Sequence, residues 1–198
     1  MPVDAVWHLR AFSDLNETMN KNSSSTRFPI RKIAVAAVVG AAYAALTMLL
    51  QPISYGEIQM RVSEALCILP YFFPSTAWGL FVGCILANLI SVAGPLDVVF
   101  GSLATLIAAL GAVAMGKWCG RGSKLLTCLM PVVSNGIIVG AVLAVTLAAD
   151  QAFLPAWGII GLEVAAGEAL VLFVLGYPLM LLLPRWAWFR KLQKDYGV

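Results

Sequence analysis

Long runs of apolar residues dominate the chain. Positions 65–96, 98–116 and 125–149 contain no charged residue. A helix of about 20 mostly apolar residues is long enough to cross a bilayer. A helix that is apolar all round, as these runs would be, is typical of a membrane span. The pattern therefore predicts a membrane protein of one domain whose chain crosses the bilayer several times.

Proline, glycine and charged positions divide these runs into six helices. The second is short because Pro70 and Pro74 lack the amide hydrogen that a helix requires. We predict an all-α, six-helix membrane domain over residues 31–184, between a flexible cytoplasmic tail (1–30) and a basic cytoplasmic tail (185–198). The expected spans are 32–50, a short helix ending near 72, 75–92, 98–118, 125–149 and 157–183.

Basic residues mark one side of the membrane. Four lie in residues 21–32, three in 117–124 and four in 185–194, whereas the alternate loops carry Asp97 and Asp150 with Arg61 as their one base. Cytoplasmic loops are enriched in Lys and Arg. Six spans with both termini in the cytoplasm satisfy every loop at once.

Composition agrees with this class of protein. The chain has 198 residues, of which 61% are hydrophobic and 12% charged, against about 25% charged in soluble domains. A soluble enzyme, a nucleic-acid binder and a secreted disulfide scaffold are excluded, and the net charge of +3 comes from the flanks.

The four cysteines form no CxxC pair and the one histidine, His8, lies in the tail. We predict no metal site, and cysteines that act as small apolar side chains.

Small residues form stripes on several helices. Ala37, Ala41 and Ala45 recur every four residues, beside a second stripe of Ala36, Gly40 and Ala44. Such stripes allow close helix approach in lipid, either inside the protein or against a separate membrane subunit. Two further pairs, Gly79 with Gly83 and Gly136 with Gly140, indicate internal packing.

Polar residues within the apolar region are the candidates for function. Glu57, Gln59, Arg61 and Glu64 precede or begin the short second helix. They form either an exposed, self-paired outer loop or the wall of a cavity, since charges at membrane depth are costly and usually face a partner. Asn88 and Asn135 can link helices or bind a ligand, and Asp97 can cap the fourth helix. Glu163 and Glu168 lie about 140° apart on the sixth helix, so they do not share a face, and at least one is expected to be functional.

The sequence contains no catalytic motif. It lacks a Ser/His or Cys/His pair, HExxH and a phosphate-binding glycine loop, and we expect no cofactor in this chain. Carboxylates and amides accept hydrogen bonds from N–H groups, and aromatic rings stack on planar molecules. The chemistry suits a planar, nitrogen-rich ligand, with these aromatic candidates: Tyr55, Trp78, Phe100 and Trp157.

Three stretches resemble the QueT family. They are residues 53–72 (ISYGEIQMRVSEALCILPYF), 78–88 (WGLFVGCILAN) and 94–106 (GPLDVVFGSLATL), and weaker similarity continues through 131–136 and 167–168. The resemblance covers about residues 30–183. It implies the six-helix fold of a substrate-binding (S) component of an energy-coupling factor (ECF) transporter, which takes up queuosine precursors or related 7-deazaguanines.

The resemblance also implies partners and roles. A transmembrane coupling subunit and two cytoplasmic ATPases would energise transport, and Ala37, Ala41 and Ala45 would dock on the coupling subunit. Glu168 is the first choice, and Glu163 the second, to accept the N–H donors of a guanine-like edge. The alternatives are an S component for another vitamin or purine, and a standalone secondary transporter. The predicted binding residues are Gln59, Arg61, Glu64, Asn88, Asp97, Asn135, Glu163 and Glu168.

Overall fold

The computed structural model describes residues 30–54, 60–91, 93–118 and 123–196. These residues form helices and turns and no strand, which confirms the predicted all-α class. Four helices are long and apolar enough to cross a membrane. They run over Ile30–Leu49, Asp97–Lys117, Ser123–Leu147 and Phe153–Arg185.

Two shorter apolar helices complete the bundle. The 3₁₀-helix η1 (Val62–Tyr71) and the helix α3 (Thr76–Asn88) are each only about 20 Å long by their residue counts. The hydrocarbon core of a bilayer is about 30 Å thick. Near the predicted positions, the described residues thus contain four helices of spanning length and two shorter apolar helices, beside further short helices.

Local departures from α-helical geometry occur at particular residues. The helix α4 (Ser102–Trp118) is preceded by a π-helical turn, η2 (Asp97–Gly101), and the helix α6 (Phe153–Val171) is followed by another, η3 (Leu172–Gly176). Such turns are frequent at functional sites.

The remaining elements are α2 (Gln51–Ser54), α5 (Ser123–Leu147), α7 (Tyr177–Leu182), η4 (Leu183–Arg185) and α8 (Ala187–Tyr196).

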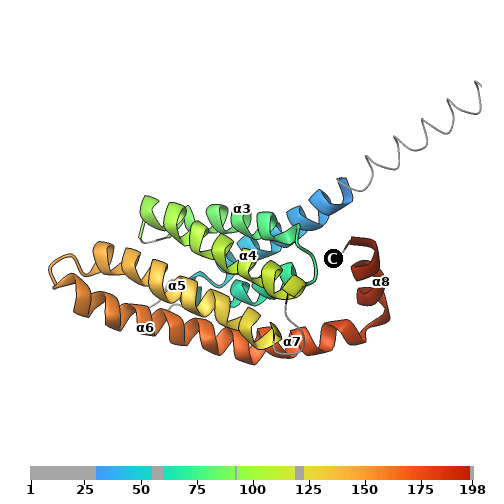
Figure 1. Cartoon of the computed structure of the whole chain (residues 1–198). Coiled ribbons are helices and arrows are strands. Elements are labelled where there is room, and N and C mark those ends of the chain that lie inside the picture. Colours follow the sequence, from blue (N-terminus) through green and yellow to red (C-terminus); the bar gives the residue numbers. More distant parts are fainter. Residues whose placement is uncertain (1–29, 55–59, 92, 119–122, 197–198) are drawn as a thin grey trace, which may run out of the picture.

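The long helices lie side by side, and η1 occupies the middle of the bundle (Figure 1). It contacts α3, α4, α5, α6 and η3. The ten-residue length of this 3₁₀-helix is unusual, because such helices rarely exceed four residues. Its side chains repeat every three residues, which places Glu64 and Cys67 on the same side of η1.

Close backbone contacts hold the helices together at the glycine pairs, as predicted. A Cβ atom at Gly79 or Gly83 would collide with the carbonyl group of Ala36 or Gly40 on the first helix. On the other side of the bundle, Gly136 and Gly140 of α5 pack against α6 around Gly161. Small residues allow this approach in lipid, where burial of apolar surface adds little.

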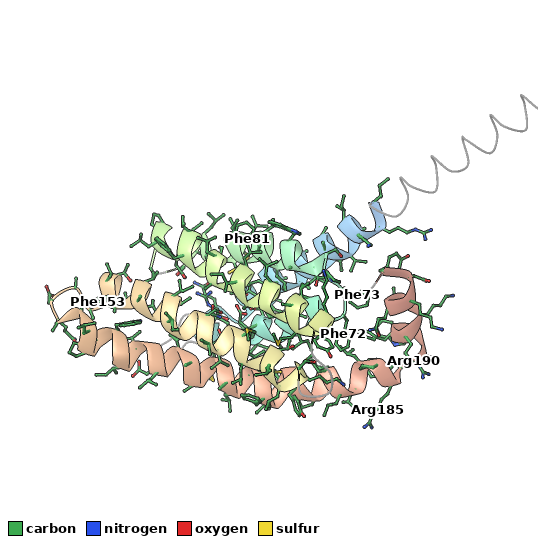
Figure 2. The ribbon with its side chains drawn as sticks, viewed as in Figure 1. Phe72, Phe73, Phe81, Phe153, Arg185 and Arg190 are labelled. Carbon is green, nitrogen blue, oxygen red and sulfur yellow. The ribbon has the colours of Figure 1, made fainter. Side chains whose placement is uncertain are left out.

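The C-terminal segment is helical and folds back across one end of the bundle. Figure 1 shows α8 lying across this end, and Figure 2 shows Phe72 and Phe73 next to it. Phe189 of α8 is buried, with its ring 5.2 Å from Phe72 and 5.4 Å from Phe73. Arg185 and Arg190 are exposed at this end.

Candidate binding site

A cluster of polar side chains is buried inside the bundle. Six of the eight predicted binding residues belong to it, and none of the six is more than 2% exposed: Arg61, Glu64, Asn88, Asp97, Asn135 and Glu168. We call this set the polar cluster. Gln59 lies outside the described residues, as does Glu57. Glu163 is exposed on the outer face of α6 and does not join the cluster.

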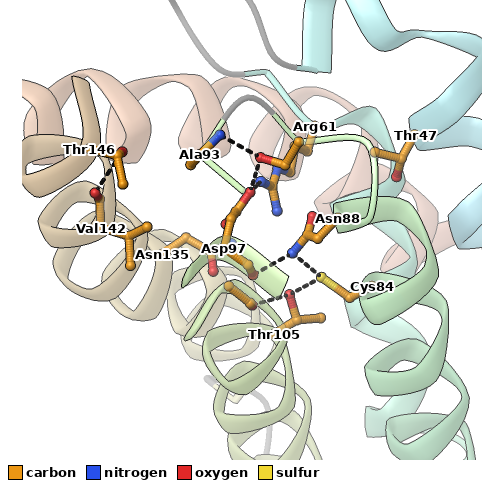
Figure 3. A network of polar contacts seen from close by, with 12 residues as sticks. Thr47, Arg61, Cys84, Asn88, Ala93, Asp97, Thr105, Asn135, Val142 and Thr146 are labelled. Carbon is orange, nitrogen blue, oxygen red and sulfur yellow. Dashed lines mark hydrogen bonds and ion pairs between the residues drawn. The ribbon is translucent and has the colours of Figure 1, made fainter. Parts of the chain in front are cut away.

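An ion pair crosses the cluster between η1 and η2. Arg61 directly precedes η1, and its guanidinium donates to Asp97 Oδ2 at 2.9 Å. The hydroxyl of Ser91 donates to the same oxygen at 2.5 Å. Asn88 at the end of α3 donates to the backbone carbonyl of Asp97 at 2.9 Å (Figure 3). Asp97 is thus a buried, multiply bonded carboxylate at the first position of the π-helical turn.

A glycine makes room for this carboxylate. A Cβ atom at Gly101 would collide with Asp97 Oδ1 and would lie 2.8 Å from Asn88 Nδ2. The loop before η2 also depends on a glycine, because Gly94 has a φ of 64°, a conformation that favours glycine. Both residues position Asp97 in the interior.

Glu64 accepts hydrogen bonds from three neutral donors. The hydroxyl of Tyr43 on the first helix donates to Oε1 at 2.5 Å, Thr105 of α4 donates to the same oxygen at 3.3 Å, and the Cys67 thiol donates to Oε2 at 2.9 Å. Cys84 joins the network through Thr105, at 3.3 Å. Cys67 and Cys84 pack in the apolar core, as predicted, and they also make hydrogen bonds to the polar cluster and to Thr105, which the sequence did not predict.

Asn135 of α5 and Glu168 of α6 form a third group. The amide Nδ2 of Asn135 donates to Glu168 Oε1 at 3.0 Å. Three buried acceptor atoms of the cluster have no hydrogen-bond partner within the described residues, namely Asp97 Oδ1, Asn135 Oδ1 and Glu168 Oε2. A buried acceptor without a donor is unfavourable, by about 1–3 kcal/mol. A bound molecule that supplies N–H or O–H donors would therefore stabilise all three atoms by hydrogen bonding.

The cluster carries more acids than bases. Among the described residues, the buried charged side chains are Arg61, Glu64, Asp97 and Glu168. One cation thus faces three carboxyl groups. Glu64 and Arg61 both lie close enough to Glu168 for their charges to act on it.

The aromatic candidates do not surround the polar cluster. Trp78 and Phe100 are 61% and 45% exposed, and Trp157 donates its indole N–H to the carbonyl of Ile137 at 3.0 Å. Tyr55 lies outside the described residues. The buried aromatic side chain that contacts the cluster is Tyr43, which the sequence analysis missed because tyrosine within an apolar helix carries no distinctive signal.

The two small-residue stripes of the first helix face in different directions. Gly40 and Ala44 are buried, and Ala36 and Gly40 contact the glycines of α3. The predicted docking residues Ala37, Ala41 and Ala45 are exposed. Ala37 and Ala41 line an open groove of about 530 Å³ between the first helix and α3, whose other wall includes Trp78 and Val82.

Metal ligands do not gather in the part of the chain that the structure describes. Within it, no three His, Cys, Asp or Glu side chains are placed to hold an ion. The chemistry that the cluster offers is hydrogen-bond acceptance and negative charge in a buried site.

Comparisons with known proteins agree on one family. The profile of the QueT transporter family matches residues 33–185. The curated protein "Queuosine precursor transporter QueT" of Lactococcus lactis subsp. cremoris (strain MG1363) is 32% identical over 151 residues, which cover 72% of this chain and 86% of that relative. No solved structure matches the chain. The matched region contains the four long apolar helices almost completely. The chain therefore belongs to the QueT transporter family and is a multi-pass membrane protein.

Proposed function

We propose that the chain is the substrate-binding subunit of an ECF-type importer and binds queuosine precursors or related 7-deazaguanines in the polar cluster. The observation that carries this proposal is the set of three buried acceptor atoms without partners, Asp97 Oδ1, Asn135 Oδ1 and Glu168 Oε2. Membership of the QueT transporter family and the name of the Lactococcus relative support the substrate class. The chain would need no cofactor of its own.

The acceptors match the donors of a deazaguanine. A guanine-like edge presents N1–H and N2–H₂ side by side, and one carboxylate can accept from both. Glu168 would take this role, which is supported by the hydrogen bond from Asn135 to Oε1 alone and by the lack of a donor to Oε2 within the described residues. Asp97 Oδ1 and Asn135 Oδ1 would accept further N–H groups of the same ligand.

Charge distribution supports a topology of six spans with both termini in the cytoplasm. The exposed bases of α8 and the basic residues at 117–124 would then lie on the cytoplasmic side. In this arrangement η1 and α3 are the two short spans, and the loop that contains Asp150 lies outside. The ligand would enter the polar cluster from the outer side.

ATP hydrolysis would take place on partner chains. The proposed partners are a transmembrane coupling subunit and two cytoplasmic ATPases. The exposed stripe of Ala37, Ala41 and Ala45 is the proposed contact with the coupling subunit, since a smooth surface permits close helix packing in lipid.

Isothermal titration of the purified protein tests the substrate class. The panel contains 7-aminomethyl-7-deazaguanine, 7-cyano-7-deazaguanine, queuine and guanine, with riboflavin and thiamine as unrelated vitamins. Saturable binding of at least one deazaguanine, and none of the vitamins, is expected. Tight binding of a vitamin, with no binding of any deazaguanine, would contradict this substrate class. It would favour the first alternative, an S component for another vitamin or purine.

The buried carboxyl groups of Glu64 and Glu168 also fit a second candidate, a standalone secondary transporter with acids as a proton relay. Co-purification separates the two functions. An S component isolated by an affinity tag from its native host should bring a membrane subunit and two ATPases with it. A secondary transporter should be isolated alone and should catalyse uptake in vesicles without ATP.

A further inference from the structure

The unequal numbers of buried acids and bases bear on which queuosine precursor the site prefers. Building on the proposed function, we propose that the polar cluster selects deazaguanines that carry a protonated amine over neutral deazaguanines of similar size. The positive charge of the ligand would supply the second cation of a site that holds one base and three carboxyl groups.

The charges of the cluster are compensated to different extents. Asp97 has Arg61 as its counter-ion at 2.9 Å. Glu64 makes no ion pair within the described residues, and three neutral donors reach its oxygens, from Tyr43, Cys67 and Thr105. Glu168 receives a single amide hydrogen bond, from Asn135. Glu168 is therefore the carboxyl group with the least compensation.

Uncompensated charge is unfavourable in a site without water or counter-ions. The oxygens of Glu64 accept hydrogen bonds from neutral groups, and Glu168 Oε2 has no donor within the described residues, so no cation is paired with either carboxyl group there. A cationic ligand would supply that counter-ion, whereas a neutral ligand supplies hydrogen-bond donors only. Buried interactions between opposite charges contribute strongly to affinity, so a measurable preference is expected.

Two ligands isolate the contribution of charge. The compounds 7-aminomethyl-7-deazaguanine and 7-cyano-7-deazaguanine share the guanine edge and differ in a small substituent, which is cationic in the first and neutral in the second. Titrated at pH 7, the wild-type protein should bind the aminomethyl compound at least about tenfold tighter. Equal affinities, or a preference for the cyano compound, would overturn the proposal. Failure of both compounds to bind would instead contradict the proposed function.

Two variants test whether the acids produce the preference. Glu64→Gln replaces a carboxyl group by a neutral amide of the same size, so it should weaken binding of the aminomethyl compound several-fold more than binding of the cyano compound. Glu163→Gln is the matched control, because this acid is exposed on α6, and both affinities should stay the same. A proportional loss for both ligands in Glu64→Gln would also overturn the proposal. If Glu64→Gln does not fold, the comparison of the two ligands in the wild-type protein still tests the proposed preference for a cationic ligand.

Discussion

The hydroxyl of Tyr43 donates a hydrogen bond to Glu64 Oε1 at 2.5 Å, which joins the first helix to η1 in the middle of the bundle. A second link lies one turn further, where Thr47 donates to Ser63 at 2.7 Å. The same helix exposes Ala37 and Ala41 on its opposite side. The proposed docking surface and the polar cluster are therefore attached to one rigid element.

Replacing Tyr43 by phenylalanine should destabilise the protein. Glu64 would lose one of its three donors while staying buried, which should lower the free energy of unfolding by about 1–3 kcal/mol. The midpoint of thermal unfolding in detergent measures the change. Tyr177→Phe is the control, because the Tyr177 hydroxyl makes no hydrogen bond within the described residues, and its midpoint should hardly move. Equal midpoints for the two variants would contradict the role of Tyr43.

Adding one methyl group at Gly79 should disrupt the contact between the first helix and α3. The new Cβ atom would collide with the backbone of Ala36, which cannot move aside as a flexible side chain does. Such overpacking typically destabilises by about 1–3 kcal/mol. The yield of monodisperse protein and its unfolding midpoint should both fall.

Gly158→Ala provides the matched control for Gly79→Ala. Gly158 lies in α6, and a Cβ atom there meets no atom within 4 Å. Alanine favours a helix over glycine by about 1 kcal/mol, so this variant should be as stable as the wild type or more so. Similar destabilisation of both variants would show that the close approach of the first helix to Gly79 does not cause the loss of stability in Gly79→Ala.

A bulky residue at Ala41 should stop uptake and leave ligand binding intact. Ala41 is exposed, so Ala41→Leu should fold, while the added side chain should hold the coupling subunit away. Uptake of a deazaguanine into cells that contain the complete transporter, compared with titration of the purified subunit, separates the two effects. Ala166→Leu is the control, since Ala166 is exposed on α6, outside the proposed docking stripe. Loss of uptake in both variants, or normal uptake in Ala41→Leu, would argue against this docking surface.

Much of the fold could be predicted because membrane helices have strong sequence signals. The apolar runs located the four long helices to within a few residues, and the glycine pairs identified two close helix contacts. The wheel angle predicted that Glu163 and Glu168 do not share a face, and the structure exposes Glu163 and buries Glu168, although both were predicted to bind the ligand. These features depend on local composition and on spacing along one helix.

Features that depend on contacts between distant residues were missed. The spacing of Glu57, Arg61 and Glu64 predicted pairing within that segment and gave no sign of Asp97, which accepts from the Arg61 guanidinium across 36 positions of the chain. The sequence also did not show that the Cys67 thiol points toward the Glu64 carboxyl group, which lies three positions earlier on η1. Sequence alone could not reveal that Trp78 faces an outer groove instead of the polar cluster.

The central claim is that a deazaguanine binds in the polar cluster through Glu168, and titration of one pair of variants tests it most directly. Glu168→Gln removes the carboxylate whose Oε2 has no partner within the described residues, and Glu163→Gln makes the same change at an exposed position five residues away on α6. We predict that Glu168→Gln weakens binding of 7-aminomethyl-7-deazaguanine at least about a hundredfold, as the loss of a buried charged partner should, and that Glu163→Gln binds like the wild type. Wild-type affinity in a folded Glu168→Gln protein would contradict the account.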